Sequence, residues 1–188
     1  MIVIEDYFED EELEIAKASQ LMCIKPVIYA ANVSEFDLKD GNNYTRLVYE
    51  YAQSHSADMV IISAKIEEEI CDLGDEAIEY MKELGIDDSG INRMIKSVYH
   101  LLNLRTFITA GEKEVHAWTV KSGSKAPKAA GVIHTDFEKG FIRAEVTSYK
   151  DFVDAGSYAV ARERGVTRLE GKDYVIQDGD IVHFRFNV

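Results

Sequence analysis

The chain has 188 residues, of which 46% are hydrophobic and 10% aromatic, a composition typical of globular proteins. No apolar run approaches the roughly 20 residues of a membrane span, and the first ten residues lack the basic and apolar regions of a secretory signal. The formal net charge of −13 is uneven: residues 1–104 hold 8 Lys/Arg against 22 Asp/Glu, whereas residues 105–188 hold 13 against 12. Because acidic surfaces repel phosphate, the second part is the candidate for any contact with nucleic acid.

The first part of the chain predicts two parallel strands joined by a helix. The apolar runs Val27–Ala31 and Met59–Ile62 are short and bounded by polar residues, which is typical of buried strands. One helical segment separates them, so a βαβ unit with a right-handed crossover is expected. The expected elements, in chain order, are a helix over 9–22, a strand over 27–31, a helix over 44–52, a strand over 59–62, and helices over about 75–84 and 90–102.

The second part has a different pattern of short strands and short helices, and the change near Asn103-Leu104 is the expected domain boundary. Two alternating segments flank Ala110–Lys113, which signals a β-hairpin. We therefore expect an α/β domain over 1–103 and an α+β module of the β-grasp type over 104–188. The expected elements are strands over 106–109 and 115–120, a helix over 125–139, a strand over 141–147, helical segments from 148 and near 157–164, and strands over 166–169, 174–176 and 181–186.

Two polar loops follow the two predicted parallel strands, at the place where α/β folds position their ligands. Asn32-Val33-Ser34-Glu35 follows the first strand, and Ser63-Ala64-Lys65 follows the second. GTPases read their base with Asn-Lys-x-Asp and Ser-Ala-Lys in this order, and the carboxylate accepts hydrogen bonds from guanine. The alternative is a turn whose polar side chains only cap the backbone. The candidates for binding a purine base are Asn32, Val33, Glu35, Ser63, Ala64 and Lys65.

The first loop departs from the GTPase pattern in a recognisable way. Glu35 stands where GTPases have Asp, and Val33 stands where they have Lys. Glutamate is longer by one methylene, so its carboxylate is displaced and selection of guanine is weakened. With this variation, the stretch 25–35 resembles the YchF (Obg-like) P-loop ATPase family, and the resemblance implies ATP in preference to GTP. Residues 104–111, 115–120, 126–146 and 169–188 resemble the TGS domain of the same family.

The resemblance covers nearly everything after Leu21 and implies a truncated parallel-sheet P-loop nucleotide domain followed by a β-grasp TGS domain. It implies that the first βαβ units precede Met1, and that the full-length protein binds ATP or GTP with Mg²⁺ and associates with ribosomes. The phosphate-binding motif Gly-x-x-x-x-Gly-Lys-[Ser/Thr] does not occur in the chain. Its nearest approach, Gly165 to Gly171-Lys172-Asp173, has five intervening residues and no hydroxyl after the lysine. We expect no catalytic residue, no cofactor and no hydrolysis for this chain alone.

Basic side chains gather around the predicted helix of the second part and its flanking strands. Such side chains on a small sheet contact phosphate backbone with little reading of sequence, and the resemblance to TGS domains adds an expected link to RNA and ribosomes. The alternative is a solvated surface interleaved with Asp136 and Glu138. The candidates for contact with RNA or a ribosome are Lys121, Lys125, Lys128, Lys139 and Arg143.

Two other function classes remain open: a stand-alone RNA- or ribosome-binding module, and a protein adaptor that uses the acidic helical part. The two cysteines, Cys23 and Cys71, lie far apart beside apolar residues, so buried reduced thiols in a cytoplasmic protein are expected. The five histidines share no metal-type spacing, and no metal site is expected. An exposed strand edge left by the truncation would favour a homodimer, and no membrane partner is expected.

Overall fold

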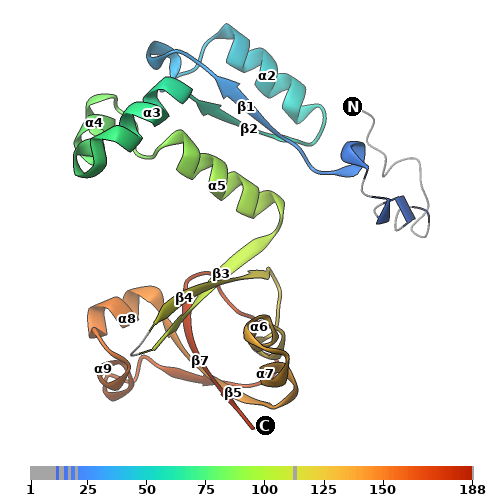
Figure 1. The fold of residues 1–188 in the computed structure, drawn as a ribbon, viewed down its shortest axis with the longest axis vertical. Coiled ribbons are helices and arrows are strands. Elements are labelled where there is room, and N and C mark those ends of the chain that lie inside the picture. The colour runs from blue at the N-terminus through green and yellow to red at the C-terminus, as the bar shows by residue number, and fades with distance from the viewer. Residues whose placement is uncertain (1–11, 13–14, 17, 20, 112–113, 188) are drawn as a thin grey trace. The chain divides into compact units, whose positions relative to one another are not determined.

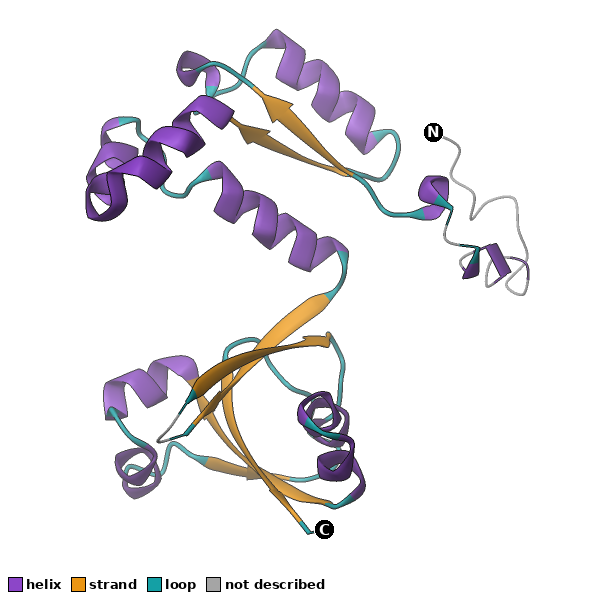
Figure 2. Cartoon of the chain, viewed as in Figure 1, coloured by secondary structure: helices purple, strands orange, loops and turns teal. Residues whose placement is uncertain are grey.

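The computed structural model describes residues 12, 15–16, 18–19, 21–111 and 114–187. The chain divides into two compact units, Met1–Leu101 and Leu102–Val188, each with its own apolar core (Figure 1, Figure 2). The helix expected over 9–22 lies largely outside the described residues. The first element whose residues are all described is the 3-10 turn η2 (Met22–Ile24). Within the described ranges, no helix is long and apolar enough to cross a lipid bilayer.

The first unit is built on two parallel strands, β1 (Ile28–Asn32) and β2 (Asp58–Ile62). Their register pairs Ile28 with Asp58 and Asn32 with Ile62, so both strands end at the same level. Helix α2 (Asn43–Gln53) makes the crossover and packs on one side of the strands, and α5 (Gly90–Leu101) packs on the other (Figure 1). The predicted βαβ unit is confirmed, and among the described residues neither outer edge of this sheet is paired.

Three helical segments connect β2 to α5: α3 (Ala64–Leu73), the 3-10 turn η4 (Gly74–Glu76) and α4 (Ala77–Glu83). Only the last two correspond to the helix predicted over 75–84, and α3 is not predicted from the sequence. Its signal was nevertheless present, because Ser63 is its N-cap and Ile66 and Ile70 recur at helical spacing. Both side chains enter the small core of this unit, whose other members are Val33, Leu38, Ile61, Tyr80, Met81, Leu84 and Ile86.

Polar side chains fix where two helices of the first unit begin. Asn42 and Thr45 form a capping box, in which the Asn42 side-chain oxygen accepts from the Thr45 N–H at 3.0 Å and the Thr45 hydroxyl accepts from the Asn42 N–H at 2.8 Å. Glu67, buried on α3, accepts from the backbone N–H of Gly90 at 2.6 Å and of Ile91 at 3.1 Å. These N–H groups have no partner within their own helix, so the Glu67 carboxylate satisfies them and fastens α5 to α3.

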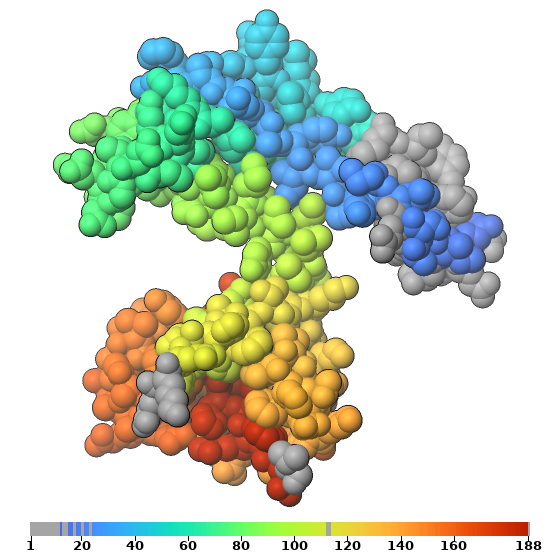
Figure 3. All heavy atoms as spheres, in the orientation of Figure 1, coloured from blue at the N-terminus to red at the C-terminus, as the bar shows by residue number. Residues whose placement is uncertain are grey.

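The second unit is a five-stranded mixed sheet of order β4-β3-β7-β5-β6, in which β3 and β7 are parallel and the other neighbours antiparallel. Helices α6 and α7 lie on one side of the strands, and α8 and α9 lie on the other (Figure 1, Figure 3). The expected α+β arrangement of the β-grasp type is confirmed. The bounds are β3 (Leu104–Ala110), β4 (Val115–Lys121), α6 (Ala126–Ile133), α7 (Thr135–Lys139), β5 (Phe141–Ser148), α8 (Tyr149–Ala155), α9 (Tyr158–Glu163), β6 (Arg168–Glu170) and β7 (Asp180–Phe186).

The core of the second unit lies between its sheet and α6. Phe107 on β3 and Phe184 on β7 meet edge to face, with ring centroids 5.8 Å apart, and both rings are buried. Trp118 packs against this core while its indole N–H donates to the Thr109 hydroxyl at 2.8 Å, so the polar end of the ring is satisfied. The helix approaches the sheet closely because its inward residues are small and fully buried: Ala126, Ala129 and Ala130.

The helix predicted over 125–139 is wrong in its middle. His134 has an extended backbone, with φ −159° and ψ 142°, which ends α6 and lets α7 begin. Its ring nitrogen Nδ1 accepts from the Asp136 N–H at 3.2 Å, so His134 acts as an N-cap and does not lie on a helix. Gly140 ends α7 as expected. The residue there is required to be glycine by a contact distant in sequence, because a Cβ would lie 1.9 Å from the carbonyl oxygen of Asn187.

Three smaller expectations are also wrong. The stretch 174–176 forms a loop with one isolated bridge, between Lys125 and Val175, and the strand expected over 166–169 lies at Arg168–Glu170. The thiol of Cys71 is exposed. Cys71 follows the inward-facing Ile70 on α3, and one residue turns a helical side chain by about 100°, away from the core. The side chain of Cys23 lies outside what the structure describes.

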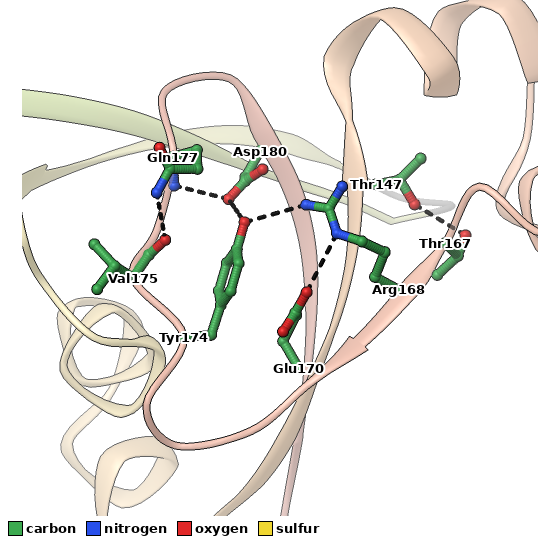
Figure 4. Close-up of polar contacts among 8 residues, drawn as sticks. All are labelled: Thr147, Thr167, Arg168, Glu170, Tyr174, Val175, Gln177 and Asp180. Carbon is green, nitrogen blue, oxygen red and sulfur yellow. Dashed lines mark hydrogen bonds and ion pairs between the residues drawn. The ribbon is translucent and has the colours of Figure 1, made fainter.

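Side-chain hydrogen bonds, together with the single bridge between Lys125 and Val175, hold the loop before β7 (Figure 4). The Tyr174 hydroxyl donates to Asp180 Oδ2 at 2.8 Å and accepts from Arg168 Nη2 at 3.2 Å. The backbone N–H of Gln177 donates to the same Asp180 oxygen at 2.8 Å. Burial and the neighbouring carboxylate raise the pKa of Tyr174 to about 12, so its hydroxyl remains a donor at neutral pH.

We predict that Arg93 on α5 can be replaced without loss of stability. Its Nε and Nη2 atoms are buried and have no hydrogen-bond partner within the described part of the chain. Since leaving buried donors without partners costs free energy, Arg93→Met is expected to leave the free energy of unfolding unchanged or to raise it by about 1–3 kcal/mol. Urea denaturation followed by circular dichroism measures this.

The control for this prediction is Arg46→Met, an exposed position on α2 whose guanidinium lies 3.9 Å from Glu50. It is expected to change the free energy of unfolding by no more than about 0.5 kcal/mol. A loss of more than about 1 kcal/mol for Arg93→Met alone would show that its guanidinium makes a stabilising contact.

Candidate functional site

The carboxyl ends of β1 and β2 bring the two polar loops side by side. The Val33 N–H donates to the Ile62 carbonyl at 2.8 Å, which extends the pairing one step past β1. The Asn32 side-chain oxygen accepts from the Ala64 N–H at 3.0 Å. This bond ties the end of β1 to the first turn of α3, and it places the residues 32–35 next to 63–65, as the sequence predicts.

A row of charged side chains connects the two loops to α4. Lys65 Nζ lies 3.9 Å from Glu35 Oε2 and 3.5 Å from Glu69 Oε1. The Tyr80 hydroxyl donates to Glu69, a hydrogen bond that lowers the pKa of Glu69 and raises the pKa of Tyr80 to about 12. The Lys65 side chain is 70% exposed, so these ion pairs contribute little stability. Their effect is to hold the Lys65 ammonium between two carboxylates.

The turn after β1 also carries one exposed aromatic ring, which is the neighbour of Glu35 in the sequence. Phe36 follows Glu35 in the turn η3 (Glu35–Asp37), and its ring is 92% exposed. The side chains of Ser34 and Asn42 both donate to the Asp37 carboxylate, at 2.9 and 3.1 Å, which fixes this turn. An exposed ring next to a carboxylate provides one group that stacks on a heteroaromatic base and one that accepts its N–H groups. Ser63 is buried and has no side-chain cap bond.

The four lysines proposed for RNA contact have different surroundings. Lys125 Nζ lies 2.7 Å from an Asp173 oxygen, and Lys128 Nζ lies 4.0 Å from a Glu138 oxygen. Each of these two lysines therefore has a carboxylate beside it that repels phosphate. The other two, Lys121 at the end of β4 and Lys139 at the end of α7, are exposed.

The fifth basic candidate, Arg143, lies on β5 directly opposite Arg185 on β7. Its neighbour Ala144 is buried in the core, and side chains alternate along a strand, so Arg143 faces away from that core. Helices α6 and α7, which carry Lys128 and Lys139, cover the core side of the sheet. The basic residues predicted from the sequence therefore do not share one surface.

Comparison with known proteins extends over both units. Residues 104–187 match the family model of the YchF-type GTPase C-terminal domain, described as a protein of unknown function (DUF933). Over 184 residues the chain is 50% identical to the ribosome-binding ATPase YchF of Bacillus subtilis. The aligned region covers 96% of this chain and 50% of that protein. It is 39% identical over 183 residues to Obg-like ATPase 1 of Gallus gallus, covering 96% and 46%. The structure of the Schizosaccharomyces pombe YchF GTPase matches with a TM-score of 0.77 and 38% identity, over 95% of this chain and 48% of that one.

This chain corresponds to the C-terminal half of the YchF and Obg-like ATPases. The resemblance to the YchF family that the loop 25–35 and the second part of the sequence indicate is thereby confirmed. The chain spans about half the length of the relatives it matches. The ATPase and ribosome-binding names belong to those longer proteins.

Three residues beside these two loops are missing from the sequence prediction. Glu69 lies four residues after Lys65 on α3, a spacing that signals an ion pair once that helix is recognised. Phe36 lies within the predicted loop region, and only its exposure distinguishes it from a core residue. Tyr80 comes from a separate helix, so no spacing in the sequence relates it to Lys65. In the described ranges no three His, Cys, Asp or Glu side chains are placed to hold a metal ion.

We predict that Asn32→Ala uncouples the loops 32–35 and 63–65. The Ala64 N–H loses its acceptor, so its hydrogen exchange is expected to accelerate, at a cost of about 0.5–1.5 kcal/mol in the free energy of unfolding. Exchange at Val33, whose N–H is bonded to the Ile62 carbonyl, should change little. Amide exchange followed by NMR reports both, with Asn43→Ala at the exposed start of α2 as the control. Unchanged protection of Ala64 would mean that Asn32 does not link the loops.

Proposed function

We propose that this chain carries the purine-recognition loops and a TGS-type module of a ribosome-associated, YchF-type ATPase. The observation that supports this most directly is the 3.0 Å hydrogen bond from the Ala64 N–H to Asn32, which joins two loops with the order and strand context of a base-binding site. In this proposal Asn32 supports the loops, Val33 and Glu35 contact the base, and residues 63–65 close over its edge. The phosphates and Mg²⁺ are held by residues outside this chain, whose sequence has no phosphate-binding motif.

The position of Glu35 explains a preference for adenine over guanine in this proposal. Guanine offers two neighbouring N–H donors to a single carboxylate, whereas the same edge of adenine offers one. The longer side chain of Glu35 and the Lys65 ammonium 3.9 Å from its oxygen both draw the carboxylate away from a two-donor geometry. A site that cannot satisfy both guanine donors loses much of its selection for guanine. ATP is therefore the proposed nucleotide, with GTP as the weaker alternative.

A chimera that places the first half of the Bacillus subtilis relative ahead of this chain tests the base site. In that background, Glu35→Asp combined with Val33→Lys is expected to lower the ATP-to-GTP ratio of kcat/KM by about tenfold or more, because it restores two-donor recognition of guanine. Glu50→Asp, an exposed carboxylate on α2, is the matched control. An unchanged ratio in an active chimera would contradict the assignment of the loop.

The 188-residue chain on its own completes this experiment. Calorimetry is expected to show no tight ATP binding, and a phosphate-release assay no ATPase activity above background, because the chain lacks the groups that hold the phosphates. Saturable micromolar binding of ATP to the chain alone would contradict the proposal that residues outside this chain hold the phosphates.

The second part of the proposal is contact with ribosomes, in the cytoplasm, through the unit Leu102–Val188. It is supported by the Bacillus subtilis relative, which is named a ribosome-binding ATPase, and by the difference in charge between the two parts of the chain, since residues 105–188 hold 13 Lys/Arg against 12 Asp/Glu. The rival functions are a stand-alone RNA-binding module and a protein adaptor that uses the acidic first unit. If the chain still captures ribosomal proteins after nuclease has digested the RNA, the adaptor is favoured.

We predict that the 188-residue chain sediments with ribosomes and that raising the salt concentration releases it. Contact with phosphates releases bound counterions, so affinity should fall steeply between about 50 and 200 mM salt. Co-sedimentation through a sucrose cushion at four salt concentrations measures this. Absent binding, or binding that does not change with salt, would refute a contact made through phosphates.

A further inference from the structure

The sheet of the second unit has a charged face opposite its core. Side chains alternate between the two faces of a strand, so every second residue of β5 and β7 points away from the core. The core-facing residues of these strands include Ala144, Val146, Val182 and Phe184. The residues between and beside them that face the other way are Arg143, Glu145, His183 and Arg185.

Two arginines on this face repel each other, and one buried carboxylate compensates for part of that repulsion. Arg143 and Arg185 are direct cross-strand partners, an arrangement that is unfavourable for like charges. Glu145, whose side chain is only 7% exposed, accepts from Arg185 Nε at 2.9 Å and from Arg162 on α9. Burial opposes the charge of this carboxylate, but the hydrogen bonds from Arg185 and Arg162 hold the pKa of Glu145 below its ordinary value. Glu145 is therefore an anion at neutral pH.

The balance of charge on this face is positive. Arg143 has no carboxylate within ion-pair distance in the described part of the chain, so Arg143, Arg162 and Arg185 give three guanidinium groups against the one carboxylate of Glu145. His183, the cross-strand partner of Glu145, adds no charge at neutral pH, because burial and the nearby Arg185 lower its pKa. We name Arg143, Arg162, Arg185 and Glu145 the arginine face.

The guanidinium groups of the arginine face are held in place and yet accessible. The side chains of Arg162 and Arg185 are 47% and 45% exposed, and Arg143 is also exposed. Each guanidinium has five N–H donors, and Glu145 accepts one from Arg185 and one from Arg162, so most donors remain free. Lys125 before α6 and Lys128 on α6 differ in this respect, since they have exposed or half-exposed carboxylates 2.7 and 4.0 Å from their ammonium groups.

We infer that the arginine face binds the phosphate backbone of RNA. Guanidinium groups match phosphate oxygens with paired hydrogen bonds, and the buried Glu145 orients two of the three before any ligand arrives. The three groups contact phosphates and read no base, so the binding has little sequence preference. The inference rests on the proposed ribosome association and names the chemical class of its partner. An acidic protein surface is the competing partner, and the test below separates the two.

The test is filter binding of the 188-residue chain to purified 16S and 23S ribosomal RNA over a range of KCl concentrations. Arg143→Gln is the informative variant, because it removes a guanidinium that has no acidic partner and leaves Glu145 with both of its donors. Loss of one phosphate contact lowers the slope of log K against log salt by about 0.7, which is about fivefold in affinity at 0.1 M. Arg46→Gln is the matched control, because this exposed arginine of α2 has Glu50 as an ion-pair partner, and it should change affinity by less than about twofold.

A second variant guards against misfolding as the cause of weaker binding. Arg185→Lys keeps a positive charge near Glu145 but removes the fork that pairs with phosphate, so affinity should fall while the thermal midpoint stays close to that of wild type. If RNA binds but Arg143→Gln behaves like wild type, the arginine face is refuted and ribosome association stands. If RNA does not bind while ribosomes still sediment the chain, the partner is a ribosomal protein and the inference is again refuted. Failure of both assays would also remove the proposed ribosome association.

Discussion

The parallel register of β1 and β2 is the constraint on which the rest of the first unit depends. Because Asn32 lies opposite Ile62, the chain leaves both strands at the same level, and the Asn32 side chain reaches the Ala64 N–H. A slip of one residue would turn Asn32 to the other face of the sheet and remove this bond. The start of α3 is thereby placed, and Glu67 on α3 in turn satisfies the first N–H groups of α5. One register thus positions both loops and two helices.

Glu35, the residue at which this chain departs from the GTPase pattern, is held by charged side chains around it. Glu35 shares the Lys65 ammonium with Glu69, and Glu69 is held by the Tyr80 hydroxyl on α4. A longer carboxylate that is anchored to a lysine has less freedom to align with two donors of one base. The Lys65 side chain is 70% exposed and the two carboxylates are partly exposed, so these ion pairs contribute little to stability. The surroundings of Glu35 therefore depend on Glu69 of α3 and Tyr80 of α4, two residues that lie outside the two motifs.

Charge in the second unit acts locally, and the sum over the unit is a poor guide to its surface. Screening in salt limits each charge to neighbours within about 10 Å, so the partner of each basic residue decides what it can bind. Lys125 is neutralised by Asp173, whereas Arg143 faces another arginine across the strand pair. The near balance of 13 basic and 12 acidic residues over 105–188 therefore includes paired lysines on one side and a positive arginine face on the other.

The sequence by itself determined the βαβ unit, the hairpin, the β-grasp class and the position of both loops, because apolar periodicity and turn residues are signals contained in short stretches. Only the tertiary structure decided the break at His134, the loop over 174–176 and the exposure of Cys71. It also decided which charges meet, as in Tyr80 with Glu69 and Arg143 with Arg185. These pairs join separate elements, and their contact depends on packing and strand register, which no single stretch of sequence encodes.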